Sequence, residues 1–520
     1  MEVSKSYMLV PVLGLLGYVI YCFYNLLEMY WLKPRRLERI LRKQGFKGSP
    51  YRLTGDPHEK KLISEALTKP IGLDDYIVKR TMPHLLHTYQ THGNKCFYWN
   101  GRFPRVVVTD PELVKEVTNR YNVFHKNFQN YDPIARILFS GLGAFDAEPW
   151  AKRRRILGRA FHVEKLKLML PAFQTSCVEM LSRWESKVSG MGGSMEMEVW
   201  REIKDLTGDM LSRTLFGVSY KESEKILEII NEIAALTMDA IISTYIPGMR
   251  FLPTKRNKRL RALDRELRGR VQVIIDKKRR AMMAGEASGD DFLGILLESN
   301  FNAQKQQGAN RGEIITDEDV ITESRLFFFG GQETGTNLIV WTMFILSRFP
   351  EWQQRAREEI WQVFGDEMPN YDGLNNLKIM TMILNEVLRM FCLVPEVSRV
   401  TAEDATLGDD FIPEGVELQM PQVLCHYQRE YWGDDVLEFK PERFAAGISN
   451  AVKAQGAYFP FTLGVRVCIG DNFVLLEAKM AMSLILRSFA LELSPSYVHA
   501  PIIRITTNPQ YGVHLILRKL

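Results

Sequence analysis

Residues 461–470 read FTLGVRVCIG, and Cys468 lies between Gly464 and Gly470, two residues after Arg466. A helical pattern over 472–488 begins just after this stretch. Glycines permit a turn with positive φ and the close approach of a flat ligand. The helix start places backbone N–H groups and the positive end of its dipole near the sulfur, and Arg466 adds a full charge. These features favour a thiolate over a thiol.

A thiolate with free space beside it is a soft metal ligand or a nucleophile. A nucleophile requires a neighbouring base, and the nine histidines form no evident partner motif with Cys468. A single thiolate can also be the axial ligand of a haem iron. A cysteine in a glycine-rich turn can equally be structural, so the loop alone leaves this alternative open.

Four further patterns stand out, two as residue pairs at helical spacing and two as short strings. Glu386 and Arg389 share one helix face, and Trp150 and Arg154 share another. Arg443 lies in the string PERF at 441–444, and 330–334 read GGQET inside a long helical pattern. Taken singly, the charged residues would be solvated surface groups.

Together, and in their order along the chain, these strings resemble the signatures of cytochromes P-450, the haem–thiolate monooxygenases. The resemblance implies a cytochrome P-450 fold, mainly α with small β-sheets, that binds heme b with Cys468 as the axial ligand of the iron. It implies that the haem propionates are held by Trp150, Arg154, Arg399 and Arg466.

The same resemblance assigns roles to two further groups of residues, one that delivers protons and one that is structural. Glu333 and Thr334 match the acid–alcohol pair that delivers protons to bound oxygen, so they are the expected catalytic residues. Glu386, Arg389 and Arg443 match a buried ion triad whose role is structural. A helix-bending or capping role is the alternative for Thr334.

Longer strings narrow the resemblance to plant family seventy-two and its clan. They include AFHVEKLKLMLPAF at 160–173 and LKIMTMILNEVLR at 377–389. The resemblance implies a terpenoid-derived substrate of iridoid, triterpenoid, steroidal sapogenin, gibberellin or brassinosteroid type. The expected function is insertion of oxygen from O2 into such a molecule. The alternatives are a haem enzyme of the same fold without monooxygenase activity, and a non-catalytic membrane haem or lipid binder.

The chain departs from the family pattern at several positions. Gly335 follows Thr334 where the family has Thr or Ser, and Leu463 and Val465 replace residues common in the haem loop. Cys392 and Leu393 occupy the place of two prolines, with Glu396 shortly after. If Glu396 faces the substrate cavity, burial should raise its pKa and it should favour hydroxylated over acidic ligands. The alternative is that Glu396 turns outward or pairs with Arg399.

Apolar periodicity predicts a body that is mostly helical. Four short alternating stretches, 95–99, 105–109, 416–421 and 513–517, predict strands near the two ends of the chain. The predicted helices are 110–119, 150–161, 163–187, 202–216, 222–242, 257–283, 316–347, 351–364, 377–391 and 472–488. The polar stretch 300–312 is predicted as a surface loop.

The N-terminus predicts a membrane anchor. Residues 6–27 contain no charged residue and, as a helix, are long enough to cross about 30 Å of hydrocarbon. Basic residues follow, so the positive-inside rule places the body in the cytosol. We expect a single-pass anchor over 1–32 in the endoplasmic reticulum membrane, a basic linker over 33–50 and a haem-binding catalytic domain over 51–520. A buried helix or a cleaved signal is the alternative.

Composition excludes several other classes. The net charge of +5 over 520 residues is too small to indicate nucleic acid binding. Six scattered cysteines without CxxC spacing favour a reducing compartment over a disulfide framework. The expected partners are NADPH–cytochrome P-450 reductase, O2, membrane lipid and a small apolar substrate. The basic stretch 150–159 is a candidate docking surface for the reductase.

Overall fold

Helices make up most of the body, and the periodic segments predicted above are all helical with slightly shifted ends. The computed structural model describes residues 3–126, 137–242, 251–286, 291–305 and 315–520. The predicted helices correspond to α6 (Pro111–Asn119), α7 (Ala147–Gly158), α8 (Val163–Gly190), α9 (Val199–Phe216), α10 (Tyr220–Ile242), α11 (Lys255–Met283), α13 (Asp317–Arg348), α14 (Pro350–Phe364), α16 (Lys378–Phe391) and α20 (Asp471–Ser488).

The remaining helices of the body are mostly short. They are α3 (Pro57–Thr68), α4 (Val78–Thr81), α5 (Pro83–His92), α12 (Phe292–Lys305), α15 (Tyr371–Asn376), α17 (Gln422–Cys425), α18 (Arg429–Trp432) and α19 (Ile448–Ala451). Helix α12 corrects the predicted loop at 300–312, because residues 300–305 are helical and 306–312 lie outside the described residues. Its first turns bury Phe292, Leu293 and Leu296, and the helix continues from there into the polar sequence.

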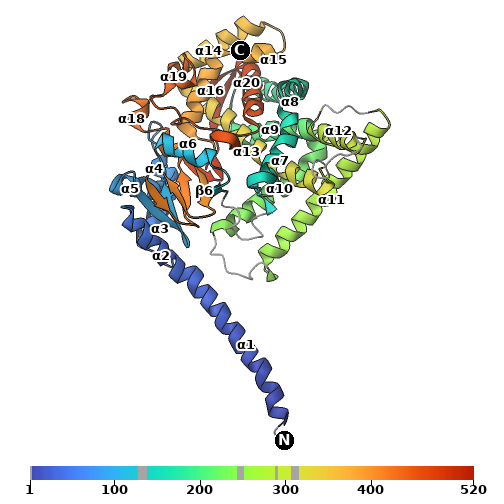
Figure 1. The fold of residues 1–520 in the computed structure, drawn as a ribbon. Coiled ribbons are helices and arrows are strands. Elements are labelled where there is room, and N and C mark those ends of the chain that lie inside the picture. Colours follow the sequence, from blue (N-terminus) through green and yellow to red (C-terminus); the bar gives the residue numbers. More distant parts are fainter. Residues whose placement is uncertain (1–2, 127–136, 243–250, 287–290, 306–314) are drawn as a thin grey trace.

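The strands form small sheets beside the helices (Figure 1). One sheet has the order β1-β2-β3-β9-β6-β4, and the others pair β10-β13-β5, β11-β12 and β7-β8. The predicted strands correspond to β2 (Cys96–Asn100), β3 (Phe103–Val107), β9 (Glu417–Met420) and β13 (His514–Lys519). The others are β1 (Lys47–Gly48), β4 (Phe124–His125), β5 (Ser194–Glu198), β6 (Val397–Thr401), β7 (Ala405–Leu407), β8 (Asp410–Ile412), β10 (Phe489–Leu493), β11 (Pro501–Arg504) and β12 (Thr506–Pro509).

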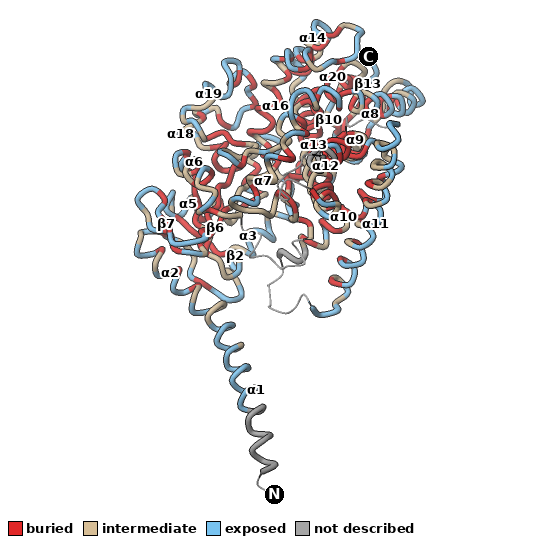
Figure 2. Tube along the Cα trace, turned by 45° about the vertical axis from the view of Figure 1, so that its right-hand side comes forward, coloured by how far each residue is buried: buried red, intermediate tan, exposed pale blue. Residues whose placement is uncertain are grey.

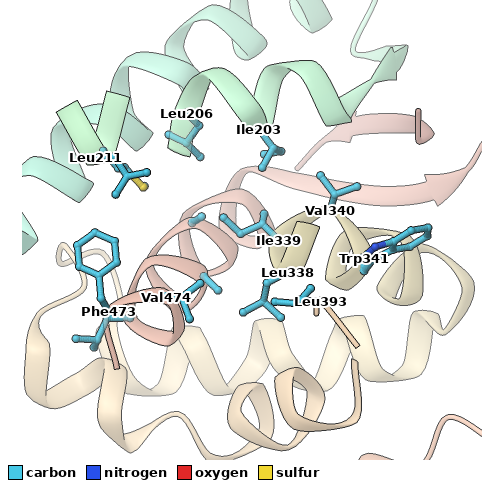
Figure 3. Packing of buried hydrophobic residues seen from close by; sticks show 14 of the residues in the cluster. Ile203, Leu206, Leu211, Leu338, Ile339, Val340, Trp341, Leu393, Phe473 and Val474 are labelled. Atoms are coloured by element: carbon cyan, nitrogen blue, oxygen red, sulfur yellow. The ribbon is translucent and has the colours of Figure 1, made fainter. Parts of the chain in front are cut away.

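Helix α13 runs through the centre of the body and carries the predicted GGQET segment. It begins with a capping box, in which Thr316 Oγ1 accepts from the Asp319 N–H at 3.1 Å and Asp319 accepts from the Thr316 N–H at 2.9 Å. Its C-terminal half is buried against α9, α16 and α20. Figure 3 shows Ile203 and Leu206 of α9 and Phe473 of α20 around this part of α13. The long helix is therefore held on several sides, which fixes the residues that follow Gly330.

The N-terminal helix projects away from the body (Figure 1). Helix α1 (Val3–Leu27) continues through the π-helical turn η1 (Glu28–Leu32) into α2 (Lys33–Lys43). The described side chains of α1 are exposed or half-buried, and Figure 2 colours them mostly as exposed. A stretch beginning at Leu13 is long and apolar enough to cross a membrane.

Helix α2 replaces most of the predicted basic linker over 33–50. Leu37 and Leu41 of α2 are buried and pack in the same cluster as Phe97 and Trp99 of β2. The basic residues lie on the other face, so this amphipathic helix docks on the sheet.

Candidate functional site around Cys468

The loop that presents Cys468 is fixed at both ends by backbone hydrogen bonds. The Cys468 N–H donates to the Phe461 carbonyl at 3.0 Å, and the Val467 N–H donates to the Gly464 carbonyl at 3.2 Å. Gly464 has φ of +69°, and a Cβ there would lie 2.6 Å from Asn119 Oδ1 and 2.8 Å from the Thr118 carbonyl. Glycine is therefore required at 464 both for its backbone conformation and for its contact with the end of α6.

Cys468 differs from the other cysteines in the accessibility of its side chain. Cys468 is the exposed one among the six cysteines, all of which lie in the described ranges. Burial by the surrounding protein nevertheless raises the pKa of this thiol, while the Gly470 N–H, Arg154 and Lys126 lower it. An accessible sulfur is what a ligand-binding cysteine requires, because the ligand must reach it.

Three cations and one carboxylate gather beside this loop. Arg466 Nη2 lies 2.9 Å from Asp146 Oδ1 and donates to the Phe145 carbonyl at 2.7 Å. Burial, together with the neighbouring charge of Arg466, lowers the pKa of Arg399 to about 10. Burial, Arg399 and Arg466 lower the pKa of Lys126 to about 7. Asp146 balances one of these charges, so the cluster carries an excess of positive charge.

This cluster fits the propionates of heme b. The Nε and Nη1 atoms of Arg466 are buried and have no hydrogen-bond partner among the described residues. Buried donors without acceptors are costly, and carboxylates bind guanidinium groups in two-pronged geometry. Two propionate groups would supply the missing acceptors and the missing negative charge, and the thiol of Cys468 lies close enough to Lys126 and Arg154 to affect their charge.

Helix α7 contributes Trp150 and Arg154 from one face. The guanidinium of Arg466 lies 4.6 Å from the centre of the Trp150 ring. Burial lowers the pKa of the half-buried Arg154, whereas Cys468 and Asp471 raise it. The structure therefore brings Cys468 together with all four residues predicted to hold the propionates.

The predicted acid and alcohol on α13 are neighbours with separate partners. Glu333 Oε1 lies 2.9 Å from Lys204 Nζ on α9, and Glu333 Oε2 accepts from Thr506 Oγ1 at 3.4 Å. Thr334 Oγ1 donates to the Gly330 carbonyl, one turn earlier, at 2.6 Å. No hydrogen bond between Glu333 and Thr334 is present, and the carboxylate is directed towards α9 and β12.

The predicted ion triad is present and buried. Glu386 and Arg389 are fully buried, with 2.7 Å between Arg389 Nε and Glu386 Oε2. Arg443 Nε lies 3.4 Å from Glu386 Oε1, and Arg443 also pairs with Asp435 at 2.7 Å. Arg389 further donates to the carbonyls of His426, Val436 and Glu438. Because these bonds connect α16 to the segment before the Cys468 loop, the triad holds the scaffold of the site.

Glu396 has a different partner from the one considered above. Its Oε1 lies 3.3 Å from Arg105 Nη1, and its Oε2 accepts from Gln419 Nε2. Glu396 directly precedes β6, which carries Arg399, and its partners Arg105 and Gln419 lie on the neighbouring strands β3 and β9. Burial raises the pKa of Glu396, and Arg105 opposes this shift.

Lys126, Asp146 and Lys204 belong to the site and were not predicted from the sequence. Asp146 directly precedes α7, where an acidic residue is also a common helix cap, so its sequence signal is ambiguous. Lys126 follows the two-residue strand β4 and Lys204 lies within α9. Neither lies in a motif, and their partners are distant in the chain.

The fold and the site define a haem–thiolate oxidoreductase. A sequence model of the family described as Cytochrome P450 matches residues 76–513, which are most of the chain, and the protein belongs to the cytochrome P450 family. Members of this family bind haem through a cysteine thiolate, and the protein is accordingly a haem–thiolate monooxygenase.

Curated plant proteins are similar over nearly their whole length. The chain is 57% identical over 505 residues to 7-deoxyloganic acid hydroxylase of Catharanthus roseus, covering 96% of this chain and 97% of that protein. It is 47% identical over 522 residues to Cytochrome P450 72A552 of Barbarea vulgaris, covering all of both chains. It is 44% identical over 499 residues to Secologanin synthase 2 of Catharanthus roseus, covering 96% and 94%.

Proposed function

We propose that this monooxygenase hydroxylates an iridoid-type terpenoid acid. The observation that carries the proposal is the 57% identity, over nearly all of both chains, to a protein named for the hydroxylation of 7-deoxyloganic acid. The pairing of Glu396 with Arg105 supports it, because a carboxylate that is already paired repels an acidic substrate less than a free one.

Cys468 is the proposed axial ligand, and Trp150, Arg154, Arg399 and Arg466 are the proposed partners of the propionates. Bound haem supplies the activation of O2 that lets oxygen enter an unactivated C–H bond. The protein supplies the sulfur ligand: burial raises the pKa of its thiol, and the Gly470 N–H, Arg154 and Lys126 oppose this shift towards the thiolate form. It also supplies guanidinium groups in an interior where their ion pairs are weakly screened by solvent.

Glu333 and Thr334 are the proposed residues for proton transfer. With haem bound, the Thr334 hydroxyl would hold a proton at Oγ1 and would release it by turning away from the Gly330 carbonyl. Lys204 holds the Glu333 carboxylate towards α9. Because this ion pair sets the direction of the Glu333 carboxylate, Lys204 is a proposed positioning residue.

The proposed electron donor is the membrane-bound NADPH–cytochrome P-450 reductase. The anchor α1 would place the body at the cytosolic face of the endoplasmic reticulum, beside this donor. Arg155 and Arg159, on and just after α7, are exposed and can contact an acidic partner.

The test is turnover in microsomes that contain the protein and the reductase. With 7-deoxyloganic acid and NADPH we expect a product heavier by one oxygen atom, and the Cys468→Ala variant should form none. A panel should include a triterpenoid sapogenin, a steroidal sapogenin, a gibberellin and a brassinosteroid. Oxidation of one of these without turnover of the iridoid acid would contradict the proposed substrate class.

A further inference from the structure

A ring of polar side chains beside Glu333 joins α9, α13 and the antiparallel hairpin of β11 and β12. Glu333 Oε1 lies 2.9 Å from Lys204 Nζ, and this cation lies 5.0 Å from the centre of the Trp200 ring, one turn earlier on α9. Trp200 Nε1 donates to Asn337 Oδ1 at 3.1 Å, and Asn337 Nδ2 donates to Thr506 Oγ1 at 3.1 Å. Thr506 Oγ1 lies 3.4 Å from Glu333 Oε2, which closes the ring.

The direction of the hydrogen bonds in this ring follows from Trp200. An indole N–H can only donate, so the atom of Asn337 that faces Trp200 must be the amide oxygen. The NH2 group of Asn337 therefore faces β12, where it donates to Thr506 Oγ1 and, at 3.2 Å, to Asn508 Oδ1. The amide of Asn508 donates to the same hydroxyl at 2.9 Å. Two amide groups thus give hydrogens to the Thr506 oxygen.

These two donors decide where the hydroxyl proton of Thr506 points. A hydroxyl oxygen has two lone pairs and one hydrogen, and both lone pairs here accept from amides. Glu333 Oε2 is the acceptor within reach of Thr506 Oγ1 among the described residues, so the hydroxyl donates to it. Thr506 and Asn337 are buried, so their polar groups must find partners within the protein.

The turn of the hairpin is strained at the residue before Thr506. Ile505, between β11 and β12, has φ of +72°, a rare conformation for a β-branched residue. Such strain persists where the surrounding structure imposes it, and it is frequent at functional sites. Thr507, the next residue, donates its hydroxyl proton to the Cys392 carbonyl at 2.6 Å. Two neighbouring hydroxyls of β12 therefore have different partners, and that of Thr506 reaches the acid.

We propose that Thr506 is a positioning residue for Glu333, because its hydroxyl donates to Oε2 and sets the direction of the carboxyl group assigned to proton transfer. Lys204 holds the other carboxyl oxygen from α9, so the acid is held from two elements. The hairpin of β11 and β12 thereby takes part in proton transfer, although 173 positions separate Thr506 from Glu333. This inference rests on the proposed role of Glu333 and adds a second group that orients it.

The contact is testable without turnover, by infrared spectroscopy of the purified ferric enzyme. The difference between the wild type and Glu333→Gln identifies the carboxyl band of Glu333. Thr506→Val keeps the side-chain shape but removes the donor, so it should shift this band, whereas Thr506→Ser should keep the wild-type frequency. Thr507→Val, on the same strand and also buried, is the matched control and should leave the band in place. The wild-type frequency in Thr506→Val would overturn the inference.

The positioning role is testable through coupling, that is, the product formed per NADPH. Thr506→Val should keep the spectrum of the reduced CO complex, lower coupling several-fold and raise peroxide, whereas Thr506→Ser and Thr507→Val should couple like the wild type. In the Glu333→Gln background, Thr506→Val should add no further loss, because both changes act through one group. Independent, additive losses would reduce Thr506 to a packing residue and overturn the inference.

A second variant tests the same ring if Thr506→Val does not fold. Trp200→Phe keeps an aromatic ring near Lys204 but removes the N–H that orients the Asn337 amide. The amide can then turn its oxygen towards Thr506 and accept the hydroxyl proton that Glu333 would otherwise receive. We expect the carboxyl band to shift and coupling to fall as in Thr506→Val, and wild-type values of both would overturn the inference.

Two outcomes separate this inference from the proposed function. Iridoid turnover with wild-type coupling and an unshifted carboxyl band in Thr506→Val would overturn the inference alone. Absence of iridoid turnover in the wild type, with the band shifted in Thr506→Val and unshifted in Thr507→Val, would overturn the proposed substrate class and support the contact between Thr506 and Glu333.

Discussion

Cys468 differs from the other cysteines in access and in its electrostatic surroundings. Cys96, Cys177, Cys392 and Cys425 are buried, and burial raises the pKa of each thiol. Burial also raises the pKa of the Cys468 thiol, but there a backbone N–H and two cations oppose the shift. We predict that Cys468→Ala abolishes the thiolate-type Soret shift of the reduced CO complex. Cys425→Ala is the control, and loss of the shift there instead would mean that the sulfur is misassigned.

We predict that substitution of Thr334 lowers the coupling of the reaction, that is, the product formed per NADPH. Thr334→Ala removes the hydroxyl proposed to deliver protons, so product per NADPH should fall while NADPH use continues and peroxide rises. General acid catalysis contributes about 10²–10⁴-fold, so a loss near the lower end is expected. Lys204→Met should instead alter the pH profile of turnover, because it frees Glu333 from its ion pair. Equal coupling in Thr334→Ala and wild type would remove Thr334 from the proton path.

Glu386 is predicted to act on stability and haem loading. Removing one member of a buried ion network leaves uncompensated charge, which costs about 3–5 kcal/mol. Glu386→Ala would leave both Arg389 and Arg443 without their common carboxylate. We expect little folded protein and little haem in the purified fraction. Glu442→Ala, in the same PERF string but half exposed, should behave like the wild type. A folded, haem-loaded but inactive Glu386→Ala would indicate a chemical role.

The residues of the candidate site could be predicted where one sequence motif contains them. They could not be predicted where the fold brings them together from separate segments. Arg466 and Cys468 stand in one string, and Trp150 and Arg154 are one helical turn apart. Lys126 and Asp146 reach the same cluster from a strand end and a helix start, and no local pattern connects them. The pairing of Glu396 with Arg105 depends on the register of β3, β9 and β6, in which Arg105 lies opposite Glu417 and Ser398 opposite Gln419.

At the scale of elements, periodicity located the long helices because each has a continuous buried face. Helix α12 was not predicted, and Asn and Gln in its second half, at 300–305, look like loop residues although a buried apolar run precedes them. Helix α2 was predicted only as a basic linker, because its basic residues outnumber the two leucines that are buried. In both cases tertiary packing decided the outcome where composition favoured a loop.

The anchor predicts different results for two truncations. Deleting residues 1–27 removes exposed helix and leaves the hydrogen bond from Tyr51 to the Tyr30 carbonyl, so the protein should move towards the soluble fraction with its haem spectrum intact. Deleting residues 1–43 also removes Leu37 and Leu41, which are buried. Each contributes about 1.5–3 kcal/mol by burial, so this variant should melt at a lower temperature. Haem loss in the shorter truncation would show that α1 contributes to the fold.

At the scale of the whole molecule, the site forms where segments from distant parts of the chain meet. Helix α7, the start of the loop after β4, strand β6 and the Cys468 loop all contribute cations, and α13 and α20 meet at Gly335 and Glu477. The positive cluster is stable only with anionic partners, which couples haem binding to the packing of these elements. We therefore expect substitutions in the cluster to change haem retention before they change the fold.

Exposed arginines on the surface of the body predict where the electron donor binds. Arg153 is committed to Asp319 at 2.6 Å, whereas Arg155 and Arg159 are exposed, so these two remain available to an acidic reductase. Charge reversal of both should raise the reductase concentration needed for half-maximal turnover and flatten its dependence on salt. Surface charges are screened over about 10 Å at 0.1 M salt, so the effect should be largest at low ionic strength. Arg201→Glu on α9, also exposed, is the matched control. If the double reversal and the control respond alike to salt, the donor binds another face of the protein.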